Sequence, residues 1–221
     1  MAKTAIILGI TGLTGSLLAK ELLASQDYEK IIAFSRRKSG LKHPKLTEYI
    51  IDLFDLEEQK MRFKANVVFC CIGTTKAKTP DKELYHKIDY GIPVAAARLC
   101  MANNIDTMIT ISAIGADAQS KIFYNCTKGE MESDVAGLGI KNCYFLQPSL
   151  IAGDRDEKRT LETVSKMIMT IINPLLIGGL KKYRSIHPLT IAKAMIQVAK
   201  NGYKHVIIPS NEIKAIAHGT Y

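Results

Sequence analysis

The chain has 221 residues, of which 47% are hydrophobic and 23% are charged, the balance of a globular protein with a well-buried core. The formal net charge is +9, but the basic residues are scattered and form no stripe with interleaved aromatics, so no nucleic-acid partner is expected. The five cysteines form no C-x-x-C pair, which argues against a disulfide framework or a metal site and predicts reduced thiols in a cytoplasmic protein. The apolar stretch 167–180 contains Pro174 and is too short to cross a bilayer, so no stable membrane insertion is expected.

Apolar runs alternate with helical patterns along the chain. The runs predict strands at residues 4–8, 30–35, 47–51, 66–72, 107–112, 142–146 and 205–208. The helical patterns cover residues 17–23, 56–63, 81–104, 118–136, 157–172 and 189–200. Continuous apolar strands between helices predict an α/β protein with a doubly wound parallel sheet, the Rossmann arrangement. We expect one domain over residues 1–221, in which about 150–190 form a small substrate-covering lobe.

Three glycines at a spacing of three separate the first strand from the first helix. Gly9 permits a sharp turn, Gly12 lets the backbone approach a pyrophosphate, and Gly15 allows the helix to pack closely on the strand. The free N–H groups of the first helical turn would then point at the anion. An ordinary tight turn is the alternative. The cofactor-binding residues predicted here are Gly9, Thr11, Gly12, Leu13, Thr14 and Gly15.

The second strand ends at Ser35, and two arginines follow. A free ribose 2′-hydroxyl is usually met at this point by an acidic residue, but none occurs between Glu29 and Glu48. Arg36 and Arg37 stand there instead, and a guanidinium group suits a 2′-phosphate. The cofactor is therefore predicted to be NADP rather than NAD. The alternative is a solvated basic loop.

Two further strand ends supply candidate cofactor contacts. Asp52, followed by Leu53, could accept a hydrogen bond from an adenine amino group or could cap the next helix. The fourth strand ends in a small turn through Cys71, Ile72 and Gly73, which lets the backbone pass close to a cofactor ribose. The cysteines of this strand are expected to be buried rather than reactive, because no cation adjoins them in sequence.

A serine ends the fifth strand, and a tyrosine and a lysine follow on one helical face. Ser112 could hydrogen-bond a substrate oxygen, and Tyr124 could donate a proton to it. A free phenol titrates near a pKa of ~10, and the positive charge of Lys128, four residues on, would bring that pKa toward working pH. Lys128 could also hold the nicotinamide ribose. We therefore predict these three residues as the catalytic set.

With these motifs the chain resembles the short-chain dehydrogenase/reductase superfamily, and more narrowly its atypical NAD(P)-binding group with the Tat-interacting oxidoreductase-like and NmrA-like proteins. The stretches that carry the resemblance are 9–15, 71–75, 112–117, 124–132 and 147–150. The resemblance implies the catalytic roles of Ser112, Tyr124 and Lys128, and a nicotinamide pocket lined by Gly73 and Pro148. The superfamily often adds an asparagine after the fourth strand, and Asp89 takes its place here.

Together these features predict an NADP-dependent oxidoreductase acting on a small carbonyl or alcohol. The alternative is a non-catalytic NADP-binding redox sensor, as among NmrA-like relatives; sugar-nucleotide epimerisation would use the same residues but usually needs a larger substrate lobe. The expected partner is a small molecule, and the chain is expected to be a monomer or a homodimer. His187, before Pro188, is expected to be a loop or capping residue, with a catalytic role as the less favoured interpretation.

Overall fold

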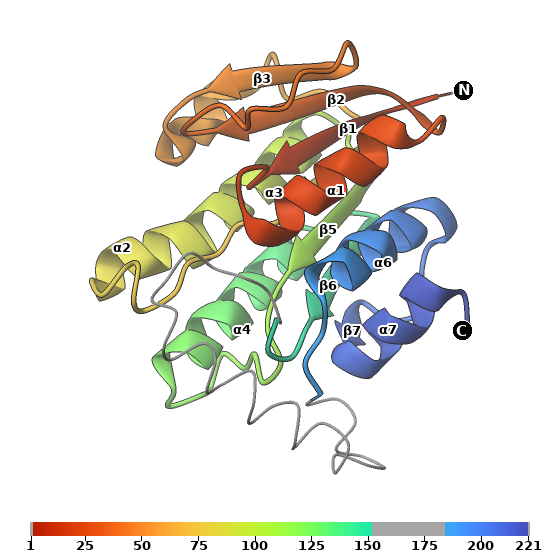
Figure 1. Cartoon of the computed structure of the whole chain (residues 1–221). Coiled ribbons are helices and arrows are strands. Elements are labelled where there is room, and N and C mark those ends of the chain that lie inside the picture. Colours follow the sequence, from red (N-terminus) through yellow and green to blue (C-terminus); the bar gives the residue numbers. More distant parts are fainter. Residues whose placement is uncertain (1, 152–183, 221) are drawn as a thin grey trace.

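The computed structural model describes residues 2–151 and 184–220 (Figure 1). The predicted helix at 157–172, the apolar stretch 167–180 and most of the predicted substrate-covering lobe lie outside the described residues. The described residues comprise the sheet, the helices that cover it and the loops at its edge.

Seven parallel strands form one twisted sheet in the order β3-β2-β1-β4-β5-β6-β7 (Figure 1). The strands are β1 (Lys3–Leu8), β2 (Tyr28–Ser35), β3 (Leu46–Ile50), β4 (Val67–Cys70), β5 (Thr107–Ile111), β6 (Asn142–Gln147) and β7 (Ile207–Pro209). The predicted doubly wound parallel sheet is confirmed. β4 ends at Cys70 rather than at residue 72, because the chain turns there and passes close to the turn at Gly9.

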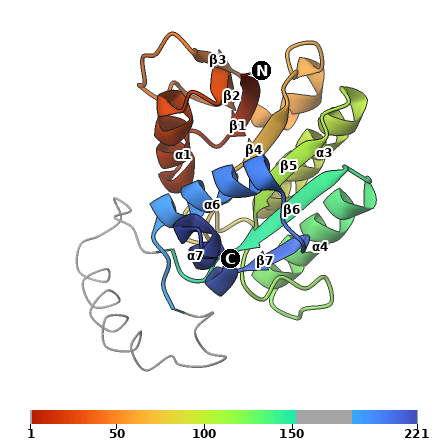
Figure 2. The same ribbon diagram turned by 90° about the vertical axis from the view of Figure 1, so that its right-hand side faces the viewer.

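The sheet is covered on both faces, as the continuous apolar strands require (Figure 2). The helices and helical turns are α1 (Leu13–Ala24), η1 (Leu53–Gln59), α2 (Lys82–His86), η2 (Lys87–Gly91), α3 (Ile92–Ala102), α4 (Phe123–Gly137), α6 (Pro188–Asn201) and α7 (Ser210–His218). Successive residues of β1 alternate between two cores: Ala5 and Ile7 pack with α1, α6 and α7, whereas Ile6 and Leu8 pack with η1, α3 and α4.

The strand order reverses direction at β1, which pairs with β2 on one side and with β4 on the other. Connections leave the carboxyl ends of these two strands toward opposite faces of the sheet, and this opens a crevice between them. The glycine turn after β1 and the small turn after β4 therefore lie at the position where α/β sheets bind ligands.

Several predicted helices differ in the structure. The helix predicted at 81–104 is divided into α2, the π-helical turn η2 and α3, and Asp89 lies within the π-helical turn. The helix predicted from residue 118 begins at Phe123, because Asp117 first closes a turn. Its side chain accepts a hydrogen bond from the N–H of Gln119, and its backbone carbonyl accepts one from the N–H of Ser120, both at 2.9 Å. α7 has no counterpart among the predictions. His187 caps α6 by accepting from the N–H of Leu189, as expected.

Candidate active site

The glycine turn is built by backbone atoms that approach each other more closely than side chains would permit. Gly9 has φ +87°, and a Cβ there would lie 2.7 Å from the carbonyl oxygen of Cys71. A Cβ on Gly15 would lie 2.1 Å from the carbonyl oxygen of Gly9. Gly12 is the N-cap of α1, so the helix has no side-chain cap, and no acidic residue lies in its first turn. Its leading N–H groups can therefore meet an anion.

The crevice at the carboxyl ends of β1, β4 and β5 is a groove of about 420 Å³, called here the central groove. It brings together residues from distant parts of the sequence. The predicted site residues that line it are Thr11, Gly12, Leu13, Thr14, Arg37, Cys71, Ile72, Gly73, Ser112, Tyr124 and Lys128. Gly9 and Gly15 lie beneath it and support the turn.

A second hollow of about 440 Å³, the arginine hollow, continues from the glycine turn toward the end of β2. Its lining residues include Thr11, Lys20, Arg37, Lys38 and Ser39. None of the described residues that line it is acidic, so it suits an anionic group. Arg37 thus borders both spaces.

Apart from Gly9, Gly15 and Pro148, three predicted cofactor residues line neither the central groove nor the arginine hollow. Arg36 lines neither the central groove nor the arginine hollow. The side chain of Asp52 accepts a hydrogen bond from the N–H of Phe54 at 3.0 Å, so it caps η1 as one of the two alternatives predicted. Leu53 is buried in the core. Binding roles for these residues stay predictions.

Lys128 is held by a buried carboxylate. Its Nζ lies 2.8 Å from Oδ1 of Asp89, and the two residues are 3% and 0% exposed. Oδ2 of Asp89 accepts from the N–H of Thr74 at 2.7 Å. Burial acts to lower the pKa of Lys128, but the carboxylate of Asp89 and the phenol of Tyr124 outweigh it, so the pKa is raised and the ammonium stays charged.

Gly73 leaves this ion pair open to the central groove. A Cβ on Gly73 would lie 3.4 Å from Oδ1 of Asp89 and 3.8 Å from Nζ of Lys128. A larger residue would therefore place its side chain over the charged groups. That the turn after β4 passes close to a ligand stays a prediction.

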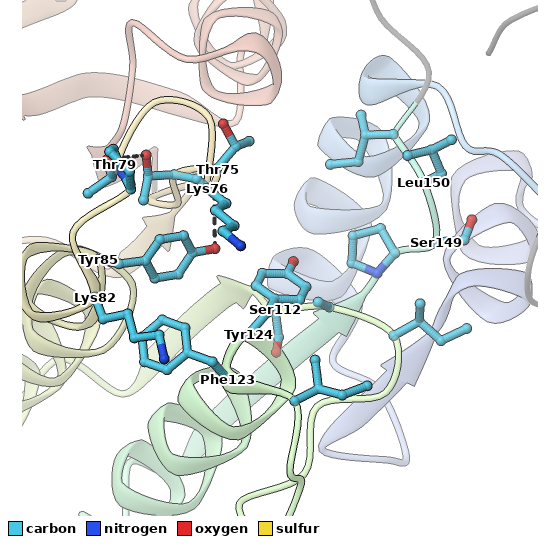
Figure 3. A pocket seen from close by; sticks show the side chains of 17 residues that line it. Thr75, Lys76, Thr79, Lys82, Tyr85, Ser112, Phe123, Tyr124, Ser149 and Leu150 are labelled. Atoms are coloured by element: carbon cyan, nitrogen blue, oxygen red, sulfur yellow. Dashed lines mark hydrogen bonds between the residues drawn. The ribbon is translucent and has the colours of Figure 1, made fainter.

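Ser112 and Tyr124 supply hydroxyl groups at the junction of the central groove with a larger cavity (Figure 3). Ser112 is buried, and its Oγ makes no hydrogen bond of regular geometry within the ranges that the structure describes. Its neighbour in the protein is the carboxylate of Glu132, whose pKa the Ser112 hydroxyl lowers, and Ser112 also lines the central groove. Tyr124 is 40% exposed, and its ring meets that of Tyr85 edge to face at a centroid distance of 6.4 Å. Pro148 lines the larger cavity and not the central groove.

α4 carries Tyr124 and Lys128 one turn apart, and its position is fixed by Gly129. A Cβ on Gly129 would lie 2.1 Å from the backbone nitrogen of Ala118, so the helix packs directly on the preceding loop. One turn further on, Glu132 is buried and accepts from Nε2 of Gln147 at 2.9 and 3.0 Å. Burial raises the pKa of Glu132 and outweighs the polar groups around it, which lower that pKa.

Two of these groups were not predicted in their observed roles. Asp89 was expected only as a substitute for an asparagine, not as the partner of Lys128, and Glu132 had no assigned role. The signal for Glu132 is present in the sequence, because Tyr124, Lys128 and Glu132 follow one another at a spacing of four residues.

The five cysteines are all free, and burial is the main cause of the raised pKa of the thiols of Cys70 and Cys71. Cys70 is fully buried, and burial raises the pKa of its thiol to about 11. Burial also raises the pKa of Cys71. Cys70 is therefore the buried strand residue that was expected, whereas Cys71 is half-buried, follows the end of β4 and lines the central groove. Within residues 2–151 and 184–220 no cluster of acidic, histidine and cysteine side chains could hold a metal ion.

Comparison with known proteins agrees with this geometry. A family model described as NAD(P)H-binding matches residues 9–136, the part that contains the central groove. The mitochondrial protein FMP52-1 of Scheffersomyces stipitis is 32% identical over 192 residues, which cover 85% of this chain and 79% of that protein. The chain belongs to the NAD(P)H-binding family and is a relative of the FMP52 proteins. The narrower resemblance to the Tat-interacting oxidoreductase-like and NmrA-like group stays a prediction.

The relatives overturn the expected location. FMP52 of Candida albicans, 29% identical over 96% of this chain and 97% of its own length, is likewise named as a mitochondrial protein. The expectation of a cytoplasmic protein is contradicted by these names. It rested on reduced thiols, which are typical of every reducing compartment and do not distinguish one from another. No described helix has the length and apolar character needed to cross a membrane.

Solved structures show the same fold at low identity. A UDP-N-acetylglucosamine 4-epimerase from Methanobrevibacter ruminantium superposes with a TM-score of 0.71 at 19% identity, covering 94% of this chain and 76% of that one. A UDP-glucose 4-epimerase from Thermotoga maritima gives 0.70 at 16% identity, covering 98% and 82%. The chain spans a still smaller share, 60%, of the Bordetella bronchiseptica enzyme WbmG. These likenesses establish the fold alone.

Proposed function

We propose that the protein is an NADP-dependent oxidoreductase that transfers a hydride between the cofactor and a small carbonyl or alcohol substrate. The observation that carries the proposal is the central groove, which joins the glycine turn to Ser112, Tyr124 and Lys128. Gly12 and the uncapped start of α1 would hold the diphosphate, and Gly73 would leave room for the nicotinamide end. The residues present thus fit a dinucleotide.

When bound, the reduced nicotinamide supplies a hydride to the carbonyl carbon of the substrate. Tyr124 donates its phenolic proton to the carbonyl oxygen, so that an alcohol is formed. Ser112 donates a hydrogen bond to the same oxygen and stabilises the developing negative charge. The charged Lys128 stabilises the phenolate that Tyr124 becomes, and solvent returns the proton afterwards.

The carboxylate of Asp89 changes how strongly Lys128 acts on Tyr124. A lone buried ammonium would stabilise the phenolate strongly, whereas an ammonium paired at 2.8 Å is partly neutralised. The pair therefore moderates how strongly Lys128 stabilises the phenolate that forms when Tyr124 gives up its proton.

The arginine hollow supports NADP as the cofactor. Arg37 and Lys38 line it together with Lys20, and a guanidinium group matches the geometry of a 2′-phosphate. We also propose a mitochondrial location for this protein, on the names of its FMP52 relatives.

The test is NADPH oxidation by the purified protein with a panel of aldehydes and ketones, followed by the loss of NADPH absorbance. Tyr124→Phe is expected to lower kcat by about 10²–10⁴-fold while NADPH affinity is retained, because only the proton donor is removed. Tyr90→Phe, on η2 and outside the groove, is the matched control. Tight NADPH binding with no turnover on any substrate would overturn the proposal in favour of the redox sensor.

A further inference from the structure

The larger cavity beside the central groove, called here the side cavity, has a volume of about 750 Å³. Its lining comes from residues 74–85, 112–114, 122–124 and 148–151. Ser112 and Tyr124 line both spaces, so a molecule in the side cavity can reach the proposed proton donor (Figure 3). The side cavity is therefore the place for a substrate, and the side chains that line it indicate which chemical groups that substrate has.

Apolar side chains form one part of this lining. Ile122 and Leu150 are 62% and 59% exposed, although large aliphatic side chains are normally buried. Phe123 and Pro148 continue the apolar surface toward Tyr124. Exposed apolar groups gathered around one cavity indicate a ligand with an apolar body.

Lysine side chains form the other part of the cavity lining. Lys76 and Lys82 lie on the same side of Tyr124 as Tyr85, with Leu150 on the other side (Figure 3). Nζ of Lys82 lies 5.5 Å from the centre of the Phe123 ring. None of the described residues that line the cavity is acidic. By contrast, the exposed Lys200 is paired with Asp27 at 2.9 Å.

We infer that the substrate is an organic anion: a carbonyl compound with an apolar, preferably aromatic, body and a carboxylate or similar anionic group that Lys76 and Lys82 bind. This inference rests on the proposed function for the reacting carbonyl, which takes its proton from Tyr124 and its hydride from NADPH. The apolar body lies against Phe123, Pro148 and Leu150. The anionic group then lies at the lysine side.

The experiment compares 4-formylbenzoate with 4-formylbenzamide, which share the ring and the aldehyde and differ in charge. Binding to the protein with NADP⁺, where no hydride can be transferred, is measured by calorimetry, and turnover is measured with NADPH. We expect 4-formylbenzoate to bind about tenfold more tightly and to give a correspondingly higher kcat/KM, because charge-assisted contacts exceed neutral ones. In Lys76→Gln/Lys82→Gln the preference should be lost. Lys193→Gln, on α6 away from the cavity, should retain it.

The outcomes separate this inference from the proposed function. Carboxylate-selective binding, with no NADPH oxidation by these aldehydes or by any aldehyde or ketone of the panel, would support the anion-binding role of the side cavity and overturn the oxidoreductase. Equal binding and equal turnover of the two aldehydes would overturn the inference and leave the oxidoreductase standing. Binding of neither aldehyde, or selectivity that persists in the double lysine variant, would also overturn the inference.

Discussion

The two ends of the central groove are built on different physical principles. At the glycine turn the surface is backbone, and its shape depends on side chains that are absent at Gly9, Gly12 and Gly15. At the other end, Lys128 and Asp89 place opposite charges in the protein interior at 2.8 Å. Steric fit therefore shapes the end at the glycine turn, and electrostatics shapes the end at Lys128. Substitutions at the two ends should therefore reduce stability and binding for different physical reasons.

The largest effect is expected from Asp89→Ala. This change leaves the ammonium of Lys128 and the N–H of Thr74 without their carboxylate in a buried site. Breaking a buried ion pair by removing one partner costs about 3–5 kcal/mol. Urea unfolding followed by circular dichroism would measure the free energy of unfolding.

A double-mutant cycle assigns this loss to the ion pair. Removing the stranded charge in Asp89→Ala/Lys128→Met should restore part of the stability, although activity stays low. Asp27→Ala, which breaks the exposed pair with Lys200, is the matched control and should change stability little. Strictly additive losses from the two single variants would show that the charges are not coupled.

The same pair predicts how stability depends on pH. The folded pKa of Lys128 lies above its ordinary value of 10.5, so its contribution is fully present below about pH 10.5 and is lost as the pH rises through the folded pKa. In Asp89→Ala the carboxylate is gone, and burial, the largest influence on Lys128, outweighs Tyr124 and lowers the folded pKa, so this variant should become more stable as the pH rises. The stability gap between the two proteins should narrow as the pH is raised from neutrality toward the ordinary lysine pKa, and a constant gap would contradict the assignment.

At the glycine turn, Gly15→Ala should cost about 1–3 kcal/mol, because the new methyl group would overlap the carbonyl oxygen of Gly9 and push α1 from the turn. NADPH affinity, measured by fluorescence titration, should fall with it. Gly137→Ala is the matched control. A Cβ there meets nothing within 4 Å, and alanine is the better helix former, so that variant should be equal to or more stable than the parent.

The glycine turn could be predicted from sequence because its signal is local. A strand, three glycines and a helix are contiguous, and the steric reason for each glycine depends on nearby chain alone, apart from the approach of Cys71 to Gly9. The parallel sheet was predictable for the same reason, since each buried strand is one uninterrupted apolar run.

The reactive end was only partly predictable. That Ser112, Tyr124 and Lys128 line one groove could be expected from their positions after the fifth strand, but the pairing of Lys128 with Asp89 joins α4 to a π-helical turn far away in the sequence. The apolar pattern at 81–104 predicts one continuous helix, and a π-helical turn within it changes the direction of every following side chain. Periodicity alone therefore could not show that Asp89 points inward. The substrate-covering lobe lies largely outside the described residues.

The smallest effect is expected at the arginine hollow, where exposed charges are screened by solvent. Arg37 lines this hollow and the central groove, whereas Arg36 lines neither, so the two neighbouring arginines form a matched pair. Arg37→Ala should weaken NADPH binding by about tenfold and leave NADH binding nearly unchanged, because a single charge-assisted contact to the 2′-phosphate is lost. Arg36→Ala should alter both affinities by less than about twofold. Fluorescence titrations of both variants with both cofactors would decide this, and equal losses for NADPH and NADH in Arg37→Ala would show that the hollow does not distinguish them.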